Sequence, residues 1–373
     1  MSSPLLKAVQ EVQHTFQRLT KHVAVPVSGF EPRLVFPDYR VPLSDFQGHH
    51  RAAFTRMKKL APEIDLVIEL RDSRAPLTTT NYLLEKVLRG KPKIVLYTKT
   101  RQSILSRQIF DKWNVKNETW GLFDNKREDH LDNVVKLIKA KCNEMEPLPP
   151  LGMKILVAGM PNVGKSTLVN RLRRKLIDTK NGNLKDVARV ERRGGTTRAV
   201  SELIKLSNDP LIYIHDTPGV MLPSMTNSKS MLIHSLLRTV DARIVDPVIS
   251  IDYFLYLANI QSPDAYLYRD FYNTPTNDVN RLLESVARSR GLFKVKTGKN
   301  KYKKVKNMVP NSTVDMKAAA ILLQEHITKS EHDKVCFDMD MMRDLSPAQI
   351  EEILDAERDR VMAMELDLPG DRD

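Results

Sequence analysis

The chain contains the octapeptide Gly159-Met160-Pro161-Asn162-Val163-Gly164-Lys165-Ser166, which fits the pattern G-x-x-x-x-G-K-[ST]. The apolar run 154–158 before it predicts a buried strand, and apolar residues three and four positions apart after it predict a helix. In such a loop, backbone N–H groups turn towards phosphate oxygens, the lysine reaches the β- and γ-phosphates, and the serine hydroxyl reaches Mg²⁺. The sequence therefore predicts a P-loop that binds a nucleoside triphosphate.

A second motif, Asp216-Thr217-Pro218-Gly219, ends the apolar run 211–215, which predicts another buried strand. In switch-type nucleotide hydrolases, an Asp at a strand end holds Mg²⁺ through water and a nearby Gly N–H contacts the γ-phosphate. Between the two motifs, residues 192–198 supply two glycines and two threonines. A threonine there is expected to complete the Mg²⁺ shell when a γ-phosphate is bound.

Guanine-nucleotide switches read the base with an Asn-Lys-x-Asp loop, and here the best candidate precedes the P-loop. The core-strand run 94–97 leads into Thr98-Lys99-Thr100-Arg101, whereas the downstream near match at 328–331 follows a half-polar helical pattern. Further strands are expected at 65–70, 119–123 and 202–206. The sequence thus predicts a six-stranded sheet in which three strands precede the P-loop strand.

This order of motifs closely resembles the circularly permuted ribosome-assembly GTPases of the YlqF/YawG type, and among them the mitochondrial ribosome-associated GTPases. The resemblance covers residues from about 36 to the 270s. Four stretches carry it: Phe46-Gln47-Gly48-His49 resembles the family's W-F-P-G-H, 72–77 its D-A-R-x-P, 195–198 its G-x-T-[KR], and 159–166 its G-x-P-N-V-G-K-S.

The resemblance implies a site for GTP and Mg²⁺, with K⁺ as a further cofactor. The implied nucleotide-binding residues are Thr98, Lys99, Asn162, Val163, Gly164, Lys165, Ser166, Thr167 and Gly219, and the implied Mg²⁺ ligands are Ser166, Thr197 and Asp216. His49, Asn162 and Thr197 are the implied catalytic residues. His49 matches the family's proposed catalytic histidine, and Asn162 matches the position that helps to bind K⁺. A structural histidine beside a glycine turn is the alternative for His49.

One departure from the family concerns the base loop. The Asp of N-K-x-D accepts two hydrogen bonds from guanine, but Arg101 stands in its place and carries only donors. We therefore expect weaker discrimination against ATP. Backbone N–H groups near 123–125 are expected to address guanine O6. Guanine remains the expected base because of the resemblance.

The 373 residues suggest about two domains. The predicted fold is α/β: an N-terminal segment 1–35, a circularly permuted P-loop GTPase domain 36–235, and a smaller α-helical domain 236–373 with a basic loop and an acidic tail. Basic and hydroxyl residues before position 25 fit either a mitochondrial presequence or an ordinary surface helix. Helices are expected within 235–258 and 277–291, and Ser346-Pro347 is expected to begin a solvated one.

The net charge of +13 favours a polyanionic partner. Residues 293–306 interleave lysines with Phe293 and Tyr302, which indicates either an RNA-binding segment or a solvated basic loop. Cys142 and Cys336 are the only cysteines and offer no disulfide framework, which favours a reducing compartment. No apolar run approaches the ~20 residues of a membrane span, so no transmembrane segment is expected.

The resemblance implies a monomeric GTPase that acts in assembly or quality control of the mitochondrial large ribosomal subunit and so supports mitochondrial translation. Its expected partners are that subunit and its rRNA. Its expected place is the mitochondrial matrix, with an association with the matrix face of the inner membrane. The altered base loop supports an alternative, a non-hydrolysing RNA-binding scaffold with a degenerate nucleotide pocket.

Overall fold

A computed structural model describes residues 29–113, 119–145, 147, 149–177, 203–298, 301–305, 312–330, 334–344 and 346–364. Three sequence predictions lie outside these residues: the N-terminal presequence, the switch threonine Thr197 and the acidic tail after residue 364. Within the described part of the chain, no helix is long and apolar enough to cross a membrane.

Six strands form one twisted sheet, as the sequence predicted. They are β1 (Leu66–Asp72), β2 (Lys93–Thr98), β3 (Thr119–Phe123), β4 (Met153–Gly159), β5 (Ile204–Asn208) and β6 (Leu211–Asp216). The spatial order is β3-β2-β1-β4-β6-β5, and only β5 pairs antiparallel. The P-loop strand β4 lies inside the sheet although it is fourth along the chain, so the predicted circular permutation is confirmed.

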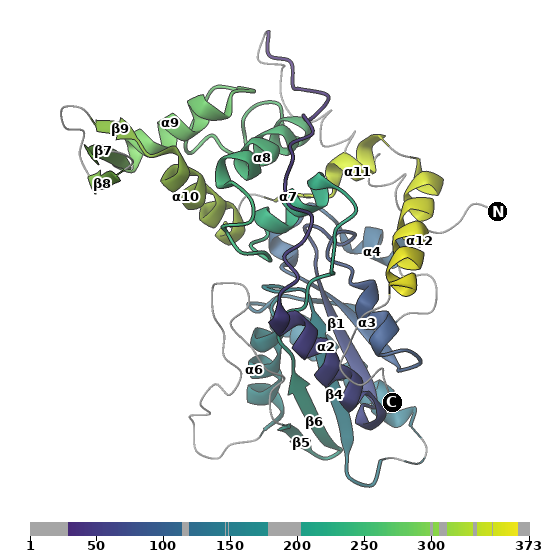
Figure 1. Cartoon of the computed structure of the whole chain (residues 1–373). Coiled ribbons are helices and arrows are strands. Elements are labelled where there is room, and N and C mark those ends of the chain that lie inside the picture. Colours follow the sequence, from purple (N-terminus) through teal and green to yellow (C-terminus); the bar gives the residue numbers. More distant parts are fainter. Residues whose placement is uncertain are drawn as a thin grey trace.

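Helices cover the sheet on both faces. They are α2 (Gly48–Leu60), α3 (Tyr82–Val87), α4 (Arg107–Trp113), α5 (Glu128–Asn143) and α6 (Lys165–Leu176), with short 3-10 helices η1 (Ala61–Glu63) and η2 (Thr100–Gln102). In Figure 1, α2 and α3 cross the front of the sheet, and α6 packs against β4, β5 and β6. The central strands β1 and β4 are almost entirely buried, which is typical of parallel sheets covered on both faces.

The second part of the molecule is mainly helical. It contains α7 (Ser228–Leu236), α8 (Pro247–Gln261), α9 (Val279–Ser289) and α10 (Met316–Lys329), together with β7 (Phe293–Gly298), β8 (Lys301–Val305) and β9 (Ser312–Val314). The helical stretch expected at 235–258 is interrupted: α7 ends at Leu236, and α8 begins at Pro247 with Asp246 as its N-cap. We call α7–α10 and this small sheet the helical region.

The basic segment 293–306 was expected to be a loop, but residues 293–298 and 301–305 form the antiparallel strands β7 and β8. Its lysines alternate with Val, Thr and Tyr, and that period of two suits a strand. Figure 1 shows this hairpin at the end of the helical region that is farthest from the six-stranded sheet. The hairpin therefore lies at a distance from the nucleotide motifs.

The end of the chain returns to the GTPase sheet. α11 (Met339–Asp344) is followed by α12 (Pro347–Ala363), which begins with the expected cap at Ser346. α12 lies beside α3 in Figure 1, and Lys86 Nζ donates to the backbone carbonyls of Met362 at 2.8 Å and Met364 at 2.6 Å. The prediction of a solvated helix is therefore wrong for one face of α12, because Val361 is buried there.

The N-terminal segment packs on the helical region. Arg33 forms an ion pair with Asp252 of α8 at 2.7 Å, and the Phe36 ring packs edge-on against Tyr253 at a centroid distance of 4.8 Å. Contacts therefore cross both domain boundaries expected from the sequence, and the division at 35/36 and 235/236 stays a prediction.

Candidate nucleotide-binding site

The strand, loop and helix expected around the P-loop are all present. Gly159 ends β4 with φ +143°, and a Cβ atom there would lie 2.5 Å from the carbonyl oxygen of Leu70. Gly164 has φ +102° and caps the N-terminus of α6. Any other residue would be strained at either glycine, which explains the spacing of the motif. The backbone of residues 163–167 thus leads into a helix N-terminus, where anions bind favourably.

Lys165 is folded back onto the P-loop. Its Nζ donates to the carbonyl oxygen of Met160 at 2.7 Å and to that of Gly159 at 3.3 Å. Burial lowers the pKa of Lys165 to about 8, although the charge of Asp216 opposes the shift. A phosphate oxygen is a stronger acceptor than these carbonyls and would favour the charged amine.

The expected Mg²⁺ ligands Ser166 and Asp216 lie next to each other. The Ser166 hydroxyl donates to Asp216 Oδ2 at 2.7 Å, and burial raises the pKa of Asp216 against the effect of this hydrogen bond. No cluster of three or more His, Cys, Asp or Glu side chains occurs in the described ranges. One hydroxyl and one carboxylate fit Mg²⁺, which takes few protein ligands and the remainder from phosphate and water. The third expected ligand, Thr197, is not described.

The loop Asp216-Thr217-Pro218-Gly219, here called the DTPG loop, contacts the P-loop directly. A Cβ atom on Gly219 would lie 2.4 Å from Cα of Pro161, so only glycine fits at this approach. Val220 N–H donates to the carbonyl oxygen of Gly159 at 3.3 Å, and the Thr217 hydroxyl donates to that of Val157 at 2.6 Å. Gly219 therefore lies against Pro161 of the P-loop, and its contact with the γ-phosphate stays a prediction.

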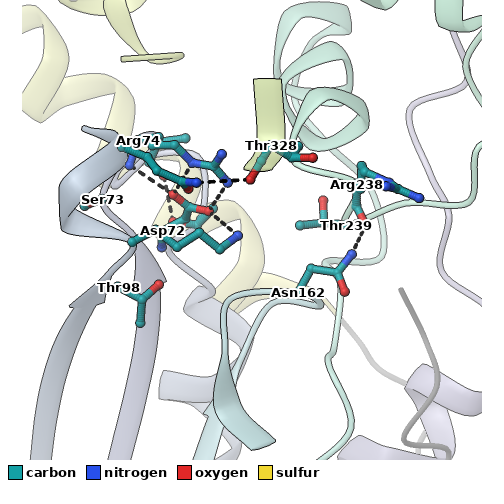
Figure 2. Close-up of polar contacts among 12 residues, drawn as sticks. Asp72, Ser73, Arg74, Thr98, Asn162, Arg238, Thr239 and Thr328 are labelled. Carbon is teal, nitrogen blue, oxygen red and sulfur yellow. Dashed lines mark hydrogen bonds and ion pairs between the residues drawn. The ribbon is translucent and has the colours of Figure 1, made fainter. Parts of the chain in front are cut away.

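The base loop rests on the Asp72-Ser73-Arg74 stretch that follows β1. Lys99 has φ 57° and donates from Nζ to Asp72 Oδ2 at 2.8 Å. Arg74 binds the same carboxylate through Nε at 3.0 Å and Nη2 at 2.8 Å, and Figure 2 shows the two side chains together. Burial would raise the pKa of Asp72, but the charges of Arg74 and Lys99 hold it well below its usual value. The sequence motif was recognised, but this supporting role of Asp72 was not.

Thr98 contributes to the frame of the site. Its hydroxyl donates to the carbonyl oxygen of Arg71 at 3.2 Å, and the residue is buried. Figure 2 shows Thr98 below the Asp72 group at the end of its strand. This hydrogen bond ties the ends of β1 and β2 together, while contact with the base stays a prediction for Thr98.

Two histidines at the start of α2 lie beside the residues that follow the DTPG loop. His50 Nδ1 accepts a hydrogen bond from Met221 N–H at 3.1 Å, and its ring lies 4.1 Å from the half-buried His49 ring. Burial, with a smaller effect of His49, lowers the pKa of His50 to about 4. The sequence prediction missed His50, although it shares the buried face of α2 with Phe54 and Met57.

Asn162 connects the P-loop to the helical region. Its side-chain Nδ2 donates to the backbone carbonyl of Arg238, which follows α7 with φ 58°. Figure 2 shows the Asn162 amide pointing at this carbonyl. A carbonyl only accepts, so the amide nitrogen must face Arg238 and Oδ1 must point away from it. The Arg238 guanidinium pairs with Glu325 of α10 at 3.2 Å.

A segment before α11 hydrogen-bonds to residues on either side of the base loop in the sequence. Phe337 N–H donates to the carbonyl oxygen of Arg74 at 2.7 Å, and Val335 N–H donates to that of Gln102 at 3.0 Å. The buried Asp338 carboxylate accepts from the Thr78 hydroxyl at 2.5 Å. Nothing in the local sequence signalled these contacts, because they join residues more than 230 positions apart.

Comparisons with known proteins agree with this site. The family model described as "50S ribosome-binding GTPase" matches residues 154–287. Mitochondrial GTPase 1 of Saccharomyces cerevisiae is 35% identical over 291 residues, which cover 72% of this chain and 79% of that protein. Mitochondrial ribosome-associated GTPase 1 of Mus musculus is 30% identical over 263 residues, or 68% of this chain and 79% of that protein.

A solved structure is also similar, the GNP-bound YlqF from T. maritima, with 19% identity, a TM-score of 0.48, and coverage of 76% of this chain and 95% of that one. The sequence identity to the Saccharomyces protein extends over more than two thirds of both chains. Together with the permuted sheet and its P-loop, this shows that the chain belongs to the mitochondrial GTPase 1 family of circularly permuted P-loop GTPases.

Proposed function

We propose that this protein binds and hydrolyses GTP as an assembly or quality-control factor of the mitochondrial large ribosomal subunit. One observation carries the proposal: Lys165, Ser166 and Asp216 meet at the P-loop, with Gly219 packed against it. In this proposal Lys165 binds phosphate, and Ser166 and Asp216 hold Mg²⁺. When bound, Mg²⁺ neutralises charge on the transferred phosphoryl group. The ribosomal role rests on the names of the relatives and on the positive charge of the chain.

Slow intrinsic hydrolysis follows from the residues after Gly219. Val220 and Met221 are buried and apolar, so neither can orient a water molecule as the glutamine of other GTPases does. His49 is the proposed replacement, since its neighbour His50 is bonded to this same loop. A neutral imidazole could orient or deprotonate water once a partner orders the surrounding segment.

Asn162 is proposed to support a K⁺ ion beside the phosphates. Its Nδ2 is engaged by Arg238, so its remaining oxygen is the atom able to bind a cation. A cation there would offset negative charge that develops during hydrolysis. Thr197 is proposed to complete the Mg²⁺ shell.

The basic hairpin β7–β8 is the proposed contact with rRNA. The register places Lys294 opposite Lys304 and Val295 opposite Lys303. Lysines therefore occur on both strands, and lysines can neutralise the phosphates of a polyanion. We further propose that the protein works as a monomer in the mitochondrial matrix, at the matrix face of the inner membrane, where it supports mitochondrial translation.

Sedimentation on mitochondrial ribosome gradients tests this proposal. With a non-hydrolysable GTP analogue, the protein should travel with large subunits, and with GDP it should stay near the top. Equal distributions with both nucleotides would contradict a nucleotide-controlled association with the subunit. Fractionation of mitochondria with and without carbonate extraction tests the peripheral membrane association.

A further inference from the structure

The base loop of this chain lacks the carboxylate that guanine recognition requires. Guanine presents two donors, N1–H and the exocyclic amine, and both need acceptors. Arg101 has only donors, and Lys99 is a donor bound to Asp72. Two acceptors must therefore come from another element if this site is to select guanine, and one carboxylate would supply both.

Such a carboxylate lies directly beside Arg101. Asp124 follows β3, the parallel neighbour of β2, and the register pairs Thr98 with Phe123. The loops after β2 and β3 therefore begin side by side at the carboxyl ends of these strands. Arg101 Nε donates to Asp124 Oδ2 at 3.1 Å, and the Asp124 side chain is 5% exposed.

The hydrogen bonds that described residues make to the Asp124 carboxylate do not use all of its acceptor positions. Lys126 N–H donates to Oδ1 at 2.9 Å, and Arg101 takes one position on Oδ2. An ionised carboxylate has about four acceptor positions, so each oxygen of Asp124 retains one. Two acceptors on a fixed carboxylate match the two donors of guanine, whereas adenine presents a lone pair at its N1 position.

We propose that Asp124 is the guanine-selecting residue and that Arg101 is a positioning residue that holds it. The selecting carboxylate has moved from the loop after β2 to the loop after β3. In this arrangement the pair Arg101–Asp124 brings a carboxylate to the base, and that carboxylate follows the neighbouring strand β3. This inference rests on the proposed function, because it concerns the same nucleotide site.

Equilibrium binding of nucleoside diphosphates tests the assignment without any hydrolysis. Competition against a fluorescent GDP should show that the parent protein prefers GDP to ADP and to xanthosine diphosphate. Asp124→Asn should weaken GDP binding at least about tenfold, because an amide nitrogen would face the exocyclic amine. The same variant should gain affinity for xanthosine diphosphate, whose 2-oxo group accepts from that amide. This gain cannot come from an unfolded protein.

Asp129→Asn is the matched control. Asp129 lies in the first turn of α5, its side chain is 62% exposed, and it pairs with Arg127. Its nucleotide preference should equal that of the parent. Arg101→Gln should lower GDP affinity less than Asp124→Asn does and should keep the preference for guanine.

Three results would overturn the proposal. The first is an Asp124→Asn variant that keeps the parent's guanine preference. The second is a loss of GDP binding by that variant without any gain for xanthosine diphosphate, which would make Asp124 purely structural. The third is a parent that prefers ADP, since Arg101 would then donate to adenine. A parent that binds no nucleotide at all would instead refute the proposed GTPase function.

Discussion

The side-chain amide of Asn162 in the P-loop donates to the backbone carbonyl of Arg238, 76 positions later in the chain. Arg238 is in turn tied to Glu325 of α10. Asn162, Arg238 and Glu325 thus form a chain of polar contacts between the phosphate-binding loop and the helical region. A change at the phosphates that turns the Asn162 amide would break its contact with Arg238. A movement of α10 would displace Arg238 and so disturb its contact with Asn162 in the P-loop.

Asn162→Ala should remove the preference for K⁺. The parent is expected to hydrolyse GTP faster in K⁺ than in Na⁺, because the Asn162 oxygen supports the larger ion. The variant should show equal, low rates in both salts, with its GDP affinity changed by less than about threefold, because GDP lacks the γ-phosphate where this cation would act. Phosphate release measured in matched chloride salts provides the comparison. A K⁺ preference that survives in Asn162→Ala would exclude this residue from the cation site.

Lys165→Ala should abolish tight binding of GTP. The buried ammonium group lies on the P-loop itself, and charge-assisted hydrogen bonds to phosphate are the strong ones. The expected loss is at least about a hundredfold, or ~2.7 kcal/mol. Lys175→Ala on the same helix is the control, because that lysine only pairs with surface acids. Tight GTP binding by Lys165→Ala would refute the P-loop assignment.

His50→Phe should destabilise the fold at neutral pH, because the buried Met221 N–H would lose its acceptor. The expected cost is ~1–3 kcal/mol in the free energy of unfolding. The pKa of His50 in the folded protein is about 4, below its ordinary value of 6.5, so folding favours the neutral ring. The contribution of His50 to the free energy of unfolding is therefore fully present above pH 6.5 and is lost as the pH falls towards 4.

Urea unfolding at pH 7.5 and pH 4.5 measures this effect. The stability difference between the parent and His50→Phe should be larger at pH 7.5 than at pH 4.5. A difference that does not change with pH would show that the ring acts by packing alone.

Replacing four of the lysines within residues 293–306 with glutamine should weaken the association of the protein with large ribosomal subunits. The lysines to be changed are Lys299, Lys301, Lys303 and Lys304, and a control variant changes the exposed Lys58, Lys59, Lys136 and Lys139 of α2 and α5. Each lost phosphate contact should reduce the slope of log K against log salt by about 0.7–0.9. An unchanged slope in the hairpin variant would favour a purely solvated hairpin.

The sequence predicted the six-stranded sheet well because β1, β2, β4 and β6 are local apolar runs that end at a motif. The P-loop glycines, the Ser166–Asp216 pair and the permuted order all follow from such local signals. The basic segment at 293–306 was missed as a hairpin, because its charge suggested a loop and hid the strand period.

The parts of the site that could not be predicted are long-range contacts. The bond from Asn162 to Arg238 and the pair Arg101–Asp124 depend on how the helices and strands pack. No spacing rule connects such residues within one sequence. Arg101 in place of an acid was visible as an anomaly, but its carboxylate partner became apparent only when β2 and β3 were seen as neighbours.

Phosphate release from GTP, with and without purified mitochondrial large subunits, tests the central claim most directly. We expect a low basal rate in K⁺ and a stimulation of at least about a hundredfold by the subunits, on the scale of general acid–base catalysis. His49→Ala should retain nucleotide affinity and lose the stimulated rate. Equal stimulated rates in the variant and the parent would remove His49 from the mechanism. An absence of phosphate release by the parent, with or without subunits, would contradict the GTPase account and favour a non-hydrolysing RNA-binding scaffold.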